Sequence, residues 1–220
     1  MLIISKGVFK MNEQLKTGTT TLGMVCKDGI VLAADKRATA GTMIVDKRAD
    51  KVHIVSDDFA VTIAGSVSDA QLLIKLIKAE LKLKEVKTNK RPTAKEAANL
   101  LGGLLYSHIR RMSMLPGIAH FLLGGKDNLG LHLYDLFPDG SVTEIKDFIS
   151  SGSGSVFAYG VLETHYKPEM TTDEAIKIAV KAVNTALHRD SASGNGIDVV
   201  VIKDKEIKYV LHKELQYSLE

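Results

Sequence analysis

The sequence predicts an α+β domain built in layers, and three features of the chain support this class. Runs of apolar residues with turn signals between them predict strands in three separate blocks. Amphipathic stretches, most of them with capping residues at their starts, predict helices in two pairs. This order of strands, two helices, strands, two helices and strands allows two stacked sheets, with one helix pair covering each outer side.

The first block of the chain predicts strands. The pair Asp28-Gly29 separates the first two apolar runs and favours a hairpin. Gly41 interrupts a mixed segment in which Met43-Ile44-Val45 is a short strand candidate. The four longer strands of this block are expected at residues 20–26, 29–35, 51–56 and 59–64.

Capping signals predict where three of the helices begin. Ser68, Thr93 and Thr171 are each followed three positions later by a Gln or Glu, which is the pattern of a capping box. The helices are expected at residues 68–87, 92–114, 155–166 and 171–189. The remaining strands are expected at residues 119–124, 129–136, 141–148, 197–202 and 206–211.

Composition places the chain among ordinary globular proteins of one sizeable domain, with 220 residues, 45% hydrophobic and 25% charged. A net charge of only +3 gives no electrostatic case for binding nucleic acid or an anionic membrane. The single cysteine, Cys26, excludes an internal disulfide and suits a reducing cytoplasm, where it is expected to be a buried core residue. The run Leu2-Ile3-Ile4 is too short for the core of a signal peptide. The histidines have no metal-ligand spacing, so no metal and no cofactor are expected.

A single glycine precedes three consecutive threonines, Gly18-Thr19-Thr20-Thr21. Strand propensity alone would make this the start of an edge strand. Further polar or glycine positions follow along the chain. They are Asp35 in Ala34-Asp35-Lys36-Arg37, Lys51 in Asp50-Lys51-Val52, Gly65 after Thr62-Ile63-Ala64, Ser151-Gly152-Ser153-Gly154-Ser155, and Arg189-Asp190-Ser191-Ala192-Ser193-Gly194.

Taken together, this ordered set resembles the β-type subunits of the proteasome, which are N-terminal threonine proteases, and most closely the archaeal kind. The resemblance extends from Gly18 to about Val210. It implies the N-terminal nucleophile hydrolase fold, a four-layer αββα sandwich of two stacked antiparallel sheets flanked by helix pairs. It also implies stacked heptameric rings shared with α-type and other β-type subunits, a regulatory ATPase acting through the α ring, and unfolded polypeptides as substrates.

A threonine hydroxyl becomes a nucleophile when a base accepts its proton, and an N-terminal threonine can supply that base from its own α-amine. An internal threonine carries an amide there, so the chain as translated is expected to be inactive. Cleavage between Gly18 and Thr19, autocatalytic by resemblance, would create the catalyst. This divides the chain into a removable propeptide, residues 1–18, and a catalytic domain, residues 19–220. Within the propeptide, Met11 is an alternative start to Met1.

Lys51 and Asp35, which follow Thr19 by 32 and 16 residues, match the family's charged pair. An ammonium near the threonine amine disfavours its protonation and stabilises a developing alkoxide. The backbone N–H of Gly65 is a candidate donor to the oxyanion. By resemblance, Ser153 hydrogen-bonds near the threonine amine, and Asp190 and Ser193 complete that polar cluster.

The substrate-binding residues also follow from the resemblance. Thr39 corresponds to the residue whose backbone pairs with an extended peptide. The first specificity pocket corresponds to Ala38, Ala49, His53, Ile63 and Val67. This lining is mostly small or apolar and favours apolar side chains before the cut bond, whereas His53 departs from the pattern and admits polar or acidic groups. Ser68 replaces a glycine common in the family and is expected to cap the following helix.

Two other interpretations compete with a threonine endopeptidase. A non-catalytic β-type subunit would shape the ring, but such relatives typically lose the Gly-Thr junction or the lysine, and this chain keeps Gly18, Thr19 and Lys51. Another amidohydrolase with an N-terminal nucleophile would explain the threonine but not the run from Arg189 to Gly194.

Overall fold

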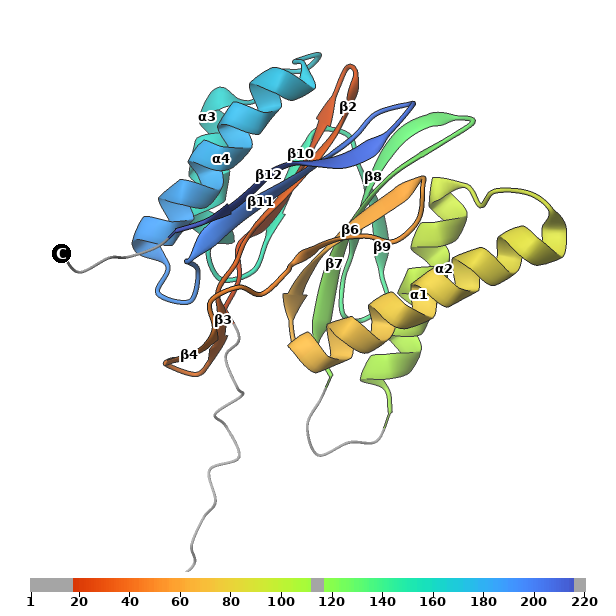
Figure 1. Ribbon diagram of the computed structural model, residues 1–220, viewed down its shortest axis with the longest axis horizontal. Coiled ribbons are helices and arrows are strands. Elements are labelled where there is room, and N and C mark those ends of the chain that lie inside the picture. Colours follow the sequence, from red (N-terminus) through yellow and green to blue (C-terminus); the bar gives the residue numbers. More distant parts are fainter. Residues whose placement is uncertain (1–17, 112–116, 216–220) are drawn as a thin grey trace, which may run out of the picture.

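The structure is a computed structural model that describes residues 18–111 and 117–215. It is a four-layer αββα sandwich, with two sheets stacked face to face and a helix pair on each outer side (Figure 1). This confirms the predicted fold class. The predicted propeptide, apart from Gly18, lies outside the described residues.

The first sheet has five antiparallel strands in the order β10-β1-β2-β11-β12. Its centre is the hairpin that Asp28-Gly29 predicts, and Thr21 pairs with Ala34 there. Strand β2 is buried along its whole length because helices cover one face and the second sheet covers the other. The strands are β1 Thr21–Cys26, β2 Gly29–Asp35, β10 Phe148–Ser151, β11 Gly196–Ile202 and β12 Ile207–Glu214.

The second sheet also has five antiparallel strands, in the sequential order β5-β6-β7-β8-β9. They are β5 Val52–Ile54, β6 Phe59–Gly65, β7 Ala119–Asp127, β8 Gly130–Leu136 and β9 Val142–Ile145. A separate two-stranded hairpin, β3 Ala38–Ala40 and β4 Met43–Asp46, lies between β2 and β5 in the chain.

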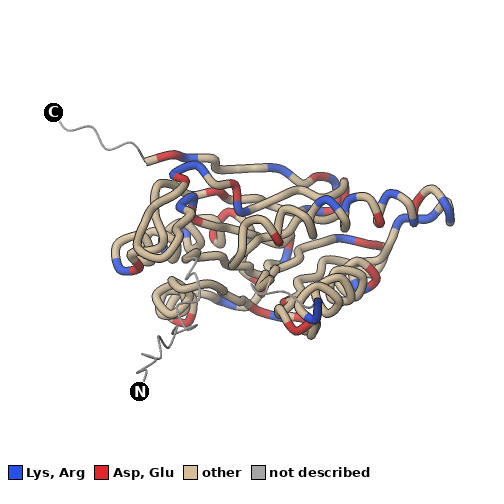
Figure 2. Tube along the Cα trace, turned by 90° about the horizontal axis from the view of Figure 1, so that it is seen from below, with Lys and Arg blue, Asp and Glu red and all other residues tan. Residues whose placement is uncertain are grey.

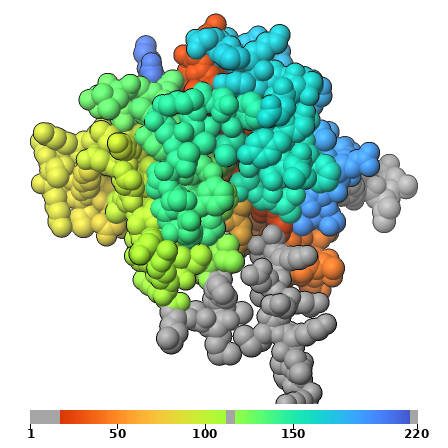
Figure 3. Space-filling view, turned by 180° about the vertical axis from the view of Figure 1, so that it is seen from behind, coloured from red at the N-terminus to blue at the C-terminus, as the bar shows by residue number. Residues whose placement is uncertain are grey.

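Helices α1 Val67–Thr88 and α2 Ala94–Ile109 cover the second sheet, and α3 Ser155–His165 and α4 Thr172–Arg189 cover the first. In the space-filling view, α3 and α4 in cyan and blue lie on the opposite side of the molecule from α1 and α2 in yellow and yellow-green (Figure 3). Three apolar clusters fill the spaces between the layers, and the middle one joins the sheets through residues such as Leu32 and Leu122.

The structure confirms the capping boxes at Thr93 and Thr171, each closed by the predicted glutamate. The predicted cap at Ser68 is wrong. Helix α1 starts at Val67 with Ser66 at its N-cap, so Ser68 lies inside the first turn, and no side chain caps the helix.

Several predicted boundaries shift by a few residues, and two predictions need a larger correction. The single strand expected at 141–148 is two strands, β9 and β10, which belong to different sheets. Helix α2 ends at Ile109, and the last residues expected in it, 112–114, lie outside the described part of the chain.

Basic and acidic residues are interspersed along the described chain (Figure 2). None of the helices in residues 18–111 and 117–215 is both long enough and apolar enough to span a membrane.

Candidate active site

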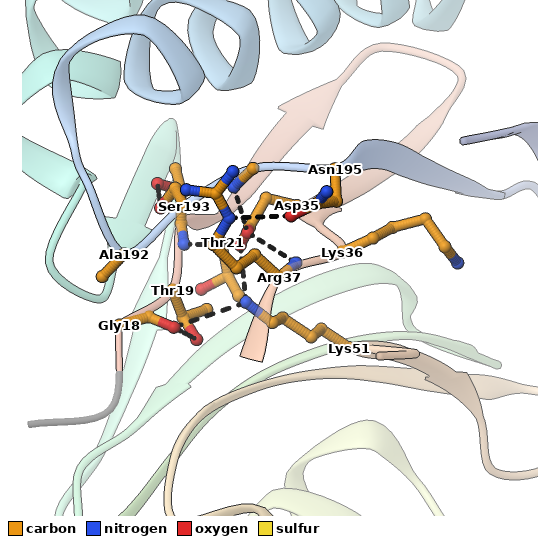
Figure 4. Close-up of polar contacts among 12 residues, drawn as sticks. Gly18, Thr19, Thr21, Asp35, Lys36, Arg37, Lys51, Ala192, Ser193 and Asn195 are labelled. Atoms are coloured by element: carbon orange, nitrogen blue, oxygen red, sulfur yellow. Dashed lines mark hydrogen bonds and ion pairs between the residues drawn. The ribbon is translucent and has the colours of Figure 1, made fainter. Parts of the chain in front are cut away.

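Thr19 lies two residues before β1, with only 4% of its surface exposed (Figure 4). Its backbone N–H donates to Ser153 Oγ at 3.2 Å, and its carbonyl accepts from the Gly154 N–H at 3.2 Å. Its hydroxyl donates to the Gly18 carbonyl oxygen at 2.6 Å. The hydroxyl therefore lies beside the bond between Gly18 and Thr19.

Gly18 occupies a place that no larger residue fits. A Cβ built on it would lie 1.7 Å from Ala192 Cβ and 3.1 Å from Ser153 Oγ. Its N–H donates to Thr39 Oγ1 at 3.0 Å. Gly18 is thus held between β3 and the loop after α4, and only glycine permits this approach.

Lys51 and Asp35 form a buried ion pair, with Nζ 2.7 Å from Oδ1. Lys51 Nζ also lies 3.5 Å from the Gly18 carbonyl oxygen. Burial lowers the pKa of Lys51 below its usual value, and the Asp35 carboxylate opposes that shift. The pair places a charge next to the Gly18–Thr19 junction, which is the position that the family resemblance implies.

A chain of hydroxyls ends on Asp190, the C-cap residue of α4. Ser153 Oγ donates to Asp190 Oδ2 at 2.6 Å, and Ser193 Oγ donates to the same oxygen at 2.7 Å. The Thr20 hydroxyl is 2.7 Å from Ser193 Oγ and, since Ser193 donates to Asp190, acts as the donor to it. The structure therefore brings the predicted Ser153, Asp190 and Ser193 into one network, which reaches the Thr19 nitrogen through Ser153.

Gly65 ends β6 with a φ of 102°, a conformation that favours glycine. A Cβ there would lie 2.3 Å from the Ile118 carbonyl oxygen, so backbone packing also requires glycine. This explains the residue type, and the role of its N–H as an oxyanion donor stays a prediction.

The predicted substrate residues come from separate elements of the chain. Thr39 lies in β3, His53 in β5 and Ile63 in β6, where the Ile63 N–H donates to the Lys51 carbonyl at 2.9 Å. Ala38 is buried in β3, Ala49 is half-buried before β5, and Val67 opens α1 with 39% exposed.

His53 is half-buried and its Nε2 lies 3.0 Å from the Asp50 carbonyl oxygen. Burial lowers the pKa of His53 below its usual value, so its ring is neutral near pH 7.

Two residues beside the site, Arg37 and Asn195, were not predicted as functional. Arg37 donates from Nε to Asn195 Oδ1 at 2.7 Å and from Nη1 to the Ser191 carbonyl at 2.8 Å. Its guanidinium also fills the space where Gly194 would carry a Cβ. Arg37 therefore holds the loop between α4 and β11. Its position two residues after Asp35 was the sequence signal that could have marked it as part of the site.

Asp50, Asp198 and His212 form a cluster with spacing that suits a metal ion, since one ligand atom from each lies within 4.8 Å of the others. The Lys36 ammonium already pairs with both carboxylates in this cluster. We assign no metal site to it because that positive charge opposes a bound cation.

The fold and the site together define a class, the N-terminal nucleophile hydrolases with the αββα sandwich. The family of proteasome subunits matches residues 15–202. Proteins named proteasome subunit beta are similar along nearly their whole length. The one from Ferroglobus placidus is 43% identical over 96% of this chain and 98% of its own, and the one from Archaeoglobus fulgidus is 44% identical over 95% and 96%. The chain therefore belongs to the proteasome subunit family, and the resemblance seen in its motifs is confirmed.

Proposed function

We propose that this chain is a catalytic β-type subunit of a proteasome core particle, a threonine endopeptidase that acts on unfolded polypeptides. The observation that carries the proposal is the contact of 2.6 Å between the Thr19 hydroxyl and the Gly18 carbonyl, with the Lys51 ammonium 3.5 Å from the same carbonyl oxygen. A nucleophile, a scissile carbonyl and a stabilising charge meet at this junction.

Activation follows from this arrangement. The Thr19 oxygen attacks the Gly18 carbonyl carbon, the C–N bond breaks, and the acyl group moves from nitrogen to oxygen while the nitrogen gains a proton. Water then hydrolyses the ester, so that residues 1–18 leave with a new carboxylate and Thr19 keeps a free hydroxyl and a free amine. The geometry supports these steps because the hydroxyl already lies next to the bond.

In the processed subunit, the free amine of Thr19 would accept the proton of its own hydroxyl during attack on a peptide. That nitrogen lies 3.2 Å from Ser153 Oγ, which is in turn fixed by Asp190. The Lys51 ammonium would keep the amine unprotonated and stabilise the alkoxide. The acyl–threonine ester is finally hydrolysed by water, which restores the enzyme.

The same proposal includes assembly. Relatives at about 43% identity are named proteasome subunit beta, so we propose that this chain stacks with α-type and β-type subunits in heptameric rings in the cytoplasm. A regulatory ATPase would act through the α ring.

A structural, non-catalytic ring subunit is the competing function. It gives no reason for the buried Lys51–Asp35 pair to lie beside a glycine that no other residue can replace.

The intact mass of the assembled subunit, together with hydrolysis of a fluorogenic peptide, tests the proposal. We expect a subunit that begins at Thr19. Thr19→Ala should remove both processing and hydrolysis without altering assembly, and Thr19→Ser should keep part of both. Active particles that still contain the full-length chain, or an alanine variant with comparable turnover, would contradict the proposal.

A further inference from the structure

Lys36 is among the largest side chains that the described part of the protein buries completely, with 1% of its surface exposed. Removing an ammonium from water is unfavourable unless anions compensate. Lys36 Nζ donates to Asp198 Oδ2 at 2.9 Å and to Asp50 Oδ1 at 3.1 Å. Burial alone would lower the pKa of Lys36, but these two hydrogen bonds raise it above its usual value, so the side chain is charged.

The two carboxylates occupy different surroundings. Asp198 is buried in β11, and His212 Nδ1 lies 2.8 Å from its second oxygen without the alignment of a hydrogen bond. The Asp50 side chain is 61% exposed and comes directly before Lys51 in the chain. Lys36 itself comes directly after Asp35. The Lys36–Asp50 ion pair therefore links the residue after Asp35 to the residue before Lys51.

The side chains of Lys36 and Lys51 point in different directions relative to the site. Lys51 reaches toward Gly18 and Asp35, whereas the side chain of Lys36 extends away from Thr19 (Figure 4). Lys36 thus does not touch the reacting atoms. Any effect it has on them must act through the segments that it connects.

The backbone strengthens this connection. The Ala49 N–H donates to the Lys36 carbonyl at 3.0 Å, and the Ile63 N–H donates to the Lys51 carbonyl at 2.9 Å. Residues 49–51 are therefore held by Lys36 on one side and by β6 on the other. The residues just before them, 41–48, are exposed, so they contribute little packing that could hold this segment.

Stability alone does not account for a buried lysine here. Replacing a buried ion pair by apolar residues of similar volume is often neutral or stabilising. A charged pair instead imposes a defined geometry on the segments that it links. We propose that Lys36 is a positioning residue, which holds Asp50 and thereby fixes Lys51 against Asp35 and the Gly18–Thr19 junction. This inference rests on the proposed function of Thr19 and Lys51.

The primary test compares Asp50→Ala with Asp57→Ala in assembled particles made from the full chain. Both changes remove one exposed carboxylate, but within residues 18–111 and 117–215 the Asp57 carboxylate has a single ion-pair partner, Arg91, at 3.9 Å. Turnover and KM are measured per processed subunit, which intact mass counts. We expect Asp50→Ala to lower kcat about tenfold or more with little change in KM, because small misplacements of a catalytic group have large rate effects. Asp57→Ala should match the unmodified chain.

A second comparison separates positioning from stability. The double variant Lys36→Met with Asp198→Leu replaces the buried pair by apolar groups, so its unfolding temperature should stay near that of the unmodified particle. Its kcat should nevertheless fall as in Asp50→Ala, since the ion pair between residue 36 and Asp50 is lost. Lys36→Arg should retain more turnover than Lys36→Met, because a guanidinium can bind both carboxylates.

The outcomes distinguish this inference from the proposed function. If hydrolysis by the unmodified particle does not depend on Thr19, the proposed function fails first. If it depends on Thr19 but Asp50→Ala turns over like Asp57→Ala, the positioning role of Lys36 is overturned. A double variant with normal turnover overturns it as well. If the double variant does not assemble, Asp50→Ala decides alone, because Asp50 is too exposed for its loss to prevent folding.

Discussion

Lys51 Nζ lies 2.7 Å from Asp35 Oδ1, and the Asp35 carboxylate is held in turn by three backbone N–H groups. The Thr20 N–H donates to Oδ1, and the N–H groups of Arg37 and Gly194 donate to Oδ2. These donors come from the residue before β1, the short connection after β2 and the loop before β11. Three segments therefore fix the Asp35 carboxylate, and this carboxylate in turn holds the Lys51 ammonium in position.

Lys51→Ala should lower peptide hydrolysis by about a hundredfold or more, because a preorganised charge next to the nucleophile is lost. The measurement should use a chain that starts at Thr19 with a free amine, so that failure of processing is not mistaken for loss of turnover. Lys51→Arg should hydrolyse peptides little faster than Lys51→Ala, since a planar guanidinium does not fit the place of a compact ammonium. Near-normal turnover of Lys51→Ala in this chain would leave the mechanism without its charge.

Asp35→Asn should lower both activity and stability. The carboxylate is fully buried and each of its oxygens accepts from two donors, so an amide nitrogen in place of either oxygen would face two of the four donors. Loss of one partner of a buried ion pair typically costs about 3 kcal/mol in the free energy of unfolding. Thermal unfolding of the particle measures this, with Asp57→Asn as the exposed control. An unfolding temperature equal to that of the control would contradict this account of Asp35.

Gly18→Ala should slow removal of the propeptide, because the new Cβ would lie 1.7 Å from Ala192 Cβ and displace the junction from the Thr19 hydroxyl. Intact mass measured over time during assembly follows this step. Gly160→Ala is a suitable control because its Cβ meets nothing within 4 Å. Adding Ala192→Gly to Gly18→Ala should restore part of the processing rate. If Gly18→Ala is processed as fast as the control, the close packing does not position the junction.

His53 should make the cleavage preference depend on pH. Since burial lowers the pKa of His53, its ring is neutral above the usual value of about 6.5 and gains its proton only in more acidic solution. Turnover of peptides with Glu before the cut bond, relative to Leu, should therefore rise as the pH falls from about 7.5 to about 5.5, where Glu remains ionised. His53→Gln should remove this rise. The same rise in the glutamine variant would exclude His53 as its cause.

The same lowered pKa makes a prediction for stability, and its sign is opposite to that of a histidine with an anionic partner. The unfolded chain binds the proton of His53 more strongly than the folded chain, so His53 has no effect on stability well above pH 6.5 and reduces it progressively as the pH falls from about 6.5 to the folded pKa. Unfolding temperatures of the unmodified protein and His53→Gln should therefore converge at neutral pH and separate in acid, with the variant more stable. A constant difference between the two proteins across this pH range would contradict the lowered pKa.

The sequence by itself determined the order of the elements and the local signals that begin and end them. The Asp28-Gly29 hairpin and the capping boxes at Thr93 and Thr171 were predicted correctly because each depends on residues only a few positions apart. The motifs around Gly18, Asp35, Lys51 and Asp190 also indicated the family, since their order and spacing along the chain are specific when taken together.

The tertiary structure decided what depends on contacts between distant segments. Residues 141–148 became strands of two different sheets because the choice depends on packing partners that strand propensity does not encode. The burial of Lys36 was likewise not predicted from the sequence, because a lysine next to Asp35 looks like a solvated charge until folding brings Asp50 and the distant Asp198 to it. The burial of a charge is a property of the folded surroundings, and only the packed structure determines it.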